Sequence, residues 1–71
     1  MKALADRITA MARSVRGDLH WPAWSTGETL MVALVLNDDV KLRSMGYTIL
    51  EALDRVDLTV AELRAIEREL E

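Results

Sequence analysis

Seven consecutive apolar residues, from Leu30 to Leu36, constrain the fold of this chain more than any other feature. The run leaves no polar face, so an element that contains it must be covered by protein on nearly every side. Ser25 and Glu28 stand three residues apart just before the run, which is the spacing of a helix capping box. The pattern predicts a central buried helix over residues 26–37, with the other segments packed around it.

A buried β-strand is the alternative for so short an apolar run. Only two of its residues, Val32 and Val35, are β-branched, and the sequence offers no second strand with which it would pair. We therefore prefer the helix.

Three polar residues, Asn37–Asp39, follow the run. Either the helix continues through them to Met45, or it ends there and Asp38 or Asp39 caps a short helix over residues 39–45. We prefer the break, because short polar side chains are favoured at helix caps and disfavoured in helix interiors.

Residues 2–16 predict an amphipathic helix, because its apolar residues recur at spacings of four, three and four and so share one stripe. These residues are Leu4, Ile8, Met11 and Val15. Gly17 and Gly46 each follow a predicted helix, at the position where a left-handed residue commonly ends it.

A second capping box, formed by Thr48 and Glu51, predicts a helix over residues 48–56. Its exposed face carries charged residues such as Asp54 and Arg55. The opposite face is expected to hold the apolar residues, which are Ile49, Leu50, Ala52, Leu53 and Val56.

A third capping box, formed by Thr59 and Glu62, predicts the last helix, over residues 59–70. Leu58 and Leu63 occupy the two positions of a hydrophobic staple around its first turn. Together the three boxes predict an all-α fold. We expect a single domain, residues 1–71, built as a compact bundle of four to five short helices around the central apolar helix.

Composition excludes several ways of stabilising so short a chain. There is no cysteine and only one histidine, His20, so disulfides and thiolate or multi-histidine zinc sites are excluded. The hydrophobic share of 51% is high for 71 residues. Self-association or a partner surface is the remaining way to use it.

The same composition predicts a cytoplasmic protein without a membrane partner. The absence of cysteine fits a reducing compartment. The longest apolar run is far shorter than the roughly 18 residues of a membrane span. The amino-terminal residues lack the apolar core of a signal peptide.

Catalytic signatures are scarce in the sequence. His20 lies near Asp18 and Ser25, but one histidine in a loop is a weak basis for a catalytic site. Asp38 and Asp39 suit helix caps better than a cation site. We expect no enzymatic activity, no cofactor and no metal.

Both tryptophans, Trp21 and Trp24, flank Pro22 in a connector that cannot be helical throughout. They either close one end of a small core or form an exposed hot spot for a partner. We favour the core and keep both as candidate partner-binding residues. The last helix offers a second candidate surface, which either forms a helix–helix seam with a partner or packs on the central helix. Its residues are Leu63, Ile66 and Leu70.

Charge is unevenly distributed along the chain, whose net charge is −3. Residues 1–20 hold four basic side chains against two acidic ones, so Arg13 and Arg16 are the candidate nucleic-acid contacts. The predicted helices 39–45 and 48–56 have the layout of a helix-turn-helix, but the exposed face of the second is acidic and would be repelled by phosphates. DNA binding is therefore the alternative and not the first hypothesis.

Two local patterns resemble known proteins. Met45-Gly46-Tyr47 resembles the Met-Gly-Phe/Tyr loop of ubiquitin-associated domains, which implies a compact three-helix module over residues 39–71 whose loop contributes to a ubiquitin contact. The pattern from Trp24 to Thr48 is similar to small uncharacterised helical proteins of actinobacteria and their phages, which implies an accessory protein that acts by binding. Our first hypothesis is a non-enzymatic helical interaction module that binds a protein partner or itself.

Overall fold

All regular elements in the computed structural model, which describes residues 3–18 and 20–71, are α-helices. They are α1 (Ala3–Val15), α2 (Thr26–Val35), α3 (Asp39–Ser44), α4 (Ile49–Arg55) and α5 (Val60–Leu70). The predicted all-α bundle is therefore confirmed for this part of the chain. The predicted start of the first helix at residue 2 lies outside the described residues.

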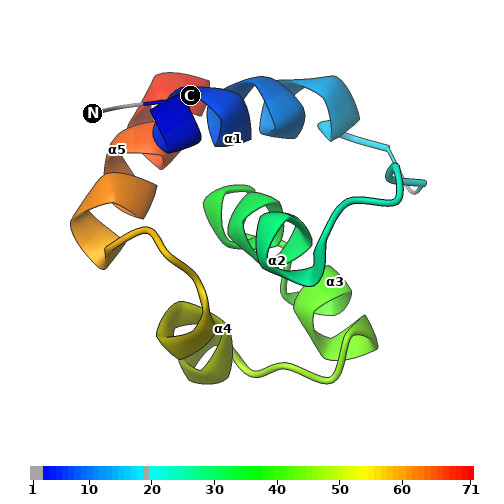
Figure 1. Cartoon of the computed structure of the whole chain (residues 1–71). Coiled ribbons are helices and arrows are strands. Elements are labelled where there is room, and N and C mark those ends of the chain that lie inside the picture. The colour runs from blue at the N-terminus through cyan, green and yellow to red at the C-terminus, as the bar shows by residue number, and fades with distance from the viewer. Residues whose placement is uncertain (1–2, 19) are drawn as a thin grey trace.

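The apolar helix α2 occupies the centre of the bundle (Figure 1). It packs against each of the other four helices, while α1 also contacts α5 and α3 also contacts α4. Its buried residues are Leu30, Met31, Val32, Ala33 and Val35. The run without a polar face is thus covered on nearly every side, as predicted, and Leu34 and Leu36 are the two of its residues that are only half-buried.

Each predicted capping box is present. At the start of α2, the Glu28 backbone N–H donates to Ser25 Oγ at 3.2 Å, and the Ser25 N–H donates to Glu28 Oε1 at 3.1 Å. The same reciprocal pairs join Thr48 to Glu51 and Thr59 to Glu62. The donated backbone N–H of the cap residue, and then its hydroxyl, lower the pKa of all three glutamates.

The predicted break after the apolar run is also present, and α2 is two residues shorter than expected. Asn37 has a φ of 56°, a left-handed conformation that asparagine tolerates better than most residues. Asp38 then caps α3, because its Oδ1 accepts a hydrogen bond from the Lys41 backbone N–H at 3.0 Å. Gly17 and Gly46 adopt φ values of 83° and 82°, as their positions predict.

The core consists of two adjoining clusters. The larger one joins α1, α2 and α5, and it contains the staple pair Leu58 and Leu63. The smaller one joins α2, α3 and α4 through Leu30, Ala33, Leu42 and Ala52. Trp21, Leu34 and Val56 pack against both clusters and connect them.

The predicted apolar face of α4 is wrong for two residues. Ala52 is fully buried, but Ile49 is 50% exposed and Leu50 is 78% exposed. At about 100° per residue, Leu50 lies about 160° around the helix from Ala52, so the two cannot both face α2. Among the described helices, none is both long and apolar enough to cross a membrane.

Candidate functional site

The two tryptophans lie half-buried where the connector meets the core. Their ring centroids are 6.0 Å apart, and the ring planes are tilted by 51°. Trp21 Nε1 donates to the Asp18 carbonyl oxygen at 3.2 Å, and Lys41 Nζ lies 5.0 Å from the centroid of the Trp21 ring. Both rings pack against the larger cluster. The indole nitrogen of Trp21 and one face of its ring therefore already interact with groups of the same chain.

The candidate seam on the last helix is buried within the chain. Leu63, Ile66 and Leu70 are only 5%, 3% and 4% exposed and belong to the larger cluster. The stripe packs against α1 and α2, because the apolar faces of those two helices are fully buried only when a third helix covers them. The hypothesis that it forms a partner surface is corrected accordingly, and the alternative that it packs on the central helix describes the structure.

The residues considered for catalysis or cation binding serve helix caps and ion pairs instead. Ser25 Oγ accepts the hydrogen bond that caps α2, and Asp38 caps α3. The Asp39 carboxylate pairs with Arg43 at 3.0 Å. His20 is exposed, and no hydrogen bond within the described ranges joins it to Asp18 or Ser25.

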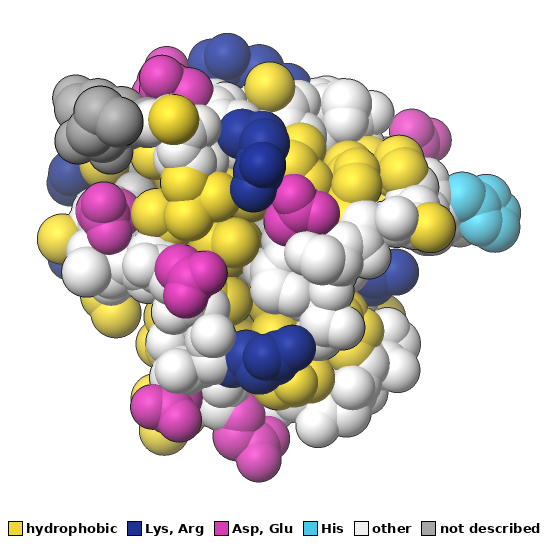
Figure 2. Space-filling view, viewed as in Figure 1, with side chains coloured by type: hydrophobic (Ala, Val, Ile, Leu, Met, Phe, Trp, Pro, Cys, Tyr) yellow, Lys and Arg dark blue, Asp and Glu magenta, His cyan; other side chains and the backbone are white. Residues whose placement is uncertain are grey.

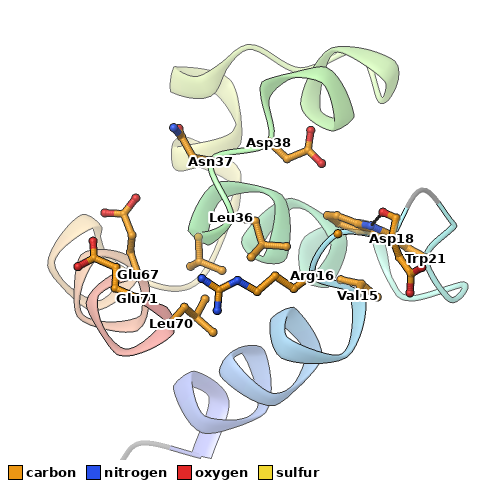
Figure 3. A pocket seen from close by; sticks show the side chains of 12 residues that line it. Val15, Arg16, Asp18, Trp21, Leu36, Asn37, Asp38, Glu67, Leu70 and Glu71 are labelled. Atoms are coloured by element: carbon orange, nitrogen blue, oxygen red, sulfur yellow. Dashed lines mark hydrogen bonds between the residues drawn. The ribbon is translucent and has the colours of Figure 1, made fainter.

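The two candidate nucleic-acid contacts, Arg13 and Arg16, are both exposed. Arg16 lines a cavity of about 490 Å³ between the carboxyl ends of α1, α2 and α5, with apolar side chains such as Leu36 and Leu70 beneath it. Figure 3 shows the Arg16 side chain extended across this cavity toward Leu70. Four carboxylates line the same cavity, those of Asp18, Asp38, Glu67 and Glu71. Four negative charges against one positive charge make its lining net negative, by three charges.

A second concave feature lies where α4 and α5 approach α2 and α3. We call it the α4–α5 groove; its volume is about 160 Å³. Its apolar lining consists of Ala33, Leu34, Leu42, Ile49, Leu53, Val60 and Leu63. Its polar lining consists of Asn37, Asp39, Arg64 and Glu67.

Two exposed apolar side chains line the α4–α5 groove, and a third is next to one of them in the sequence. Ile49 and Val60 line it and are 50% and 54% exposed, and Leu50 follows Ile49 with 78% exposure. Val40 on α3 is also exposed, by 66%, but it lines a different cavity next to Trp21. Val40 is therefore a natural internal control for the groove.

The sequence contains a signal for this groove that the periodicity of α4 obscured. Ile49 and Val60 each directly follow the threonine that caps their helix. A hydrophobic staple uses the residue before the cap and the fourth residue after it, so a staple does not explain an apolar residue at this position. Two such residues in one short chain indicate apolar groups that the local fold does not require.

The chain segment that forms α4 and the start of α5 is mostly acidic. Residues 48–62 hold four acidic side chains and one basic one, Arg55, for a net charge of −3. Arg55 Nε donates to the Tyr47 hydroxyl at 2.9 Å. Figure 2 shows acidic side chains over α4 and over the connector to α5, with a basic side chain between them.

Comparisons of the chain with family models, with curated proteins and with solved structures give no match.

Proposed function

We propose that this protein is a non-enzymatic helical interaction module that binds a protein partner through the α4–α5 groove. The observation that carries the proposal is the exposure of Ile49 and Val60, each by half or more, in the lining of a groove with apolar walls. Adjoining exposed apolar groups typify protein-binding surfaces. An apolar cleft with a few polar groups at its edge is the usual form of a binding site.

The allocation of side chains supports this proposal. The smaller core cluster contains two alanines, Ala33 and Ala52, while the larger Ile49 and Leu50 remain outside it. The small side chains of Ala33 and Ala52 let α2 and α4 pack closely, and a larger residue at either position would overpack this cluster. Ile49 and Leu50 are therefore free of any role in the core that would require their size.

The charge around Arg16 argues against DNA binding as the main function. A duplex presents a dense row of phosphates, and Arg16 shares its cavity with four carboxylates that would repel them. We therefore do not extend the proposal to nucleic acid. Arg13→Ala with Arg16→Ala would abolish any binding by this face while leaving the helical content unchanged, and a mobility-shift assay at low salt measures it.

The proposal includes action in the cytoplasm, which the absence of cysteine supports. Self-association through the same groove is the competing form of the function. Light scattering at increasing protein concentration distinguishes them: a mass that stays at 8.0 kDa supports a separate partner. A shift to twice that mass would replace the partner by a second copy.

The proposal is tested by an NMR titration with a neutral amphipathic peptide of about 18 residues, long enough to be helical in water. The peptide carries a leucine stripe and is otherwise alanine and glutamine. We expect the amide shifts of Ile49, Leu53 and Val60 to change most. The double variant Ile49→Ser with Val60→Ser should lose these changes, and Val40→Ser should keep them.

Two outcomes of this titration would contradict the proposal. One is equal binding by the groove variant and by the Val40→Ser control, which would place the contact elsewhere. The other is the absence of any shift change in the wild-type protein at peptide concentrations in the millimolar range, where even weak apolar contacts are detected.

A further inference from the structure

Resting on the groove proposed above, we infer that the partner segment is an amphipathic helix whose polar face carries lysine or arginine. The inference combines the apolar groove with the net negative charge of residues 48–62, the segment that supplies Ile49, Leu53 and Val60 to its walls. It names the chemistry of the partner and not its identity.

The first step concerns the conformation of the bound segment. The groove walls are helices, whose backbone N–H and C=O groups are mostly paired within each helix. The described residues contain no strand to which an extended segment could add. A segment bound as a helix satisfies its own backbone groups and presents apolar side chains one turn apart.

The second step concerns the charges that the segment would meet. Asp54 lies one helical turn after the exposed Leu50 and so beside it on the surface of α4. Asp57 follows in the connector between α4 and α5. Both are exposed, and neither belongs to the ion pairs found among the described residues, which join Arg7 with Glu28 and Arg43 with Asp39.

The remaining charged groups near the groove do not offset the negative charge of Asp54 and Asp57. Arg55 donates to the Tyr47 hydroxyl, and Asp39 is already paired with Arg43. Within the groove lining, the charge of Arg64 is balanced by that of Glu67. Glu51 and Glu62 complement the amino ends of their own helices, so Asp54 and Asp57 are the uncompensated groups. A segment with lysine or arginine beside its apolar stripe complements them, and an acidic segment is repelled.

The same charges disfavour a second copy of this chain as the occupant. A two-fold contact through the groove would bring the surface of residues 48–62, with its net charge of −3, against itself. The basic face of α1 in another copy does not substitute. Its apolar residues, including Ile8 and Val15, are buried in the core and have nothing to insert.

The test compares three peptides that share one leucine stripe and differ only in the polar face, which is lysine, glutamine or glutamate. Affinity is measured by calorimetry at low and at physiological salt. Two to three exposed charge pairs of modest strength predict that the lysine peptide binds about tenfold more tightly than the glutamine peptide at low salt. The glutamate peptide should bind more weakly than both. Added salt screens the charges and should reduce the differences in affinity between the three peptides.

Charge-reversal variants locate the effect. Asp54→Lys with Asp57→Lys should invert the order, so that the glutamate peptide binds most tightly. The matched control is Asp6→Lys with Glu69→Lys, which makes the same change in net charge at a cavity between α1 and α5. The control should preserve the original order.

The outcomes separate this inference from the proposal beneath it. If all three peptides bind equally and Ile49→Ser with Val60→Ser abolishes binding, the groove is a binding site but its partner is not basic, and the inference fails alone. If the two charge-reversal double variants change the order of peptide affinities equally, the preference depends only on the net charge of the protein, which also overturns the inference. If no peptide depends on Ile49 and Val60, both the inference and the proposed function fail.

Discussion

The same chemical change, leucine to alanine, should have very different effects at Leu50 and Leu63. Full burial of a leucine contributes roughly 1.5–3 kcal/mol, and only about a fifth of Leu50 is buried, which leaves roughly 0.3–0.6 kcal/mol. Alanine has the higher helix propensity and offsets part of that. Leu63 is 5% exposed in the larger cluster, and its truncation also leaves a cavity, for a loss of about 2–5 kcal/mol.

Urea unfolding followed by circular dichroism measures both effects. For 71 residues the total stability is roughly 4–11 kcal/mol, so the two variants should separate clearly. We expect Leu50→Ala to unfold within about 0.5 kcal/mol of the wild type. A loss above about 1.5 kcal/mol at Leu50 would show that this side chain is buried, which would refute the reasoning that leaves it free for a partner.

Three further predictions concern the helix ends. Asn37→Ala should destabilise the protein by about 1 kcal/mol in urea, because alanine resists the left-handed conformation, and Asn37→Gly should not. Thr59→Ala should lower stability by about 1 kcal/mol in the same assay, because it removes the cap of α5. The capping hydrogen bonds lower the pKa of Glu28, Glu51 and Glu62 below the ordinary 4.5, so their stabilisation is present above that pH and is lost as the pH falls through the lowered values. Replacing all three by glutamine, which keeps the box, should flatten the fall in urea midpoint below pH 4.5.

The helix boundaries were largely predictable because the signals that set them are local. A capping box such as Ser25 with Glu28 involves four consecutive residues, and its hydrogen bonds form wherever the helix packs. The glycine past a helix end, as at Gly46, is equally local. The break after α2 was harder to predict, because it depends on Asn37 adopting a left-handed conformation that the sequence permits without requiring.

The burial of each side chain was less predictable, because it depends on how the helices are placed. The split of α4 into two faces groups Leu50 with Ala52, and only the position of α2 decides which of them is covered. The stripe of α5 could have met a partner or the core, and periodicity is the same in both cases. The larger cluster settled that choice through the three-helix contact of α1, α2 and α5.

The candidate groove was missed for the same reason. Its walls come from four helices, so no single segment of sequence contains it. One local signal for the groove exists: an apolar residue, Ile49 or Val60, directly follows the capping threonine of its helix. This signal becomes informative only when the positions of the hydrophobic staple are assigned. The two tryptophans are the largest side chains of the chain, yet both rings pack against the core: Trp21 against both clusters and Trp24 against the larger one.

Site-specific photocrosslinking in the cells that produce the protein tests the central claim most directly. A benzophenone amino acid is placed at position 50, which directly follows the groove-lining Ile49, or at position 40, which is similarly exposed on α3 and does not line the groove. We predict a discrete crosslinked species of higher mass from position 50 that disappears when Ile49→Ser and Val60→Ser are added, and none from position 40. Equal crosslinking from both positions, or a species from position 50 that survives the two serine substitutions, would contradict the claim that this groove is the binding site.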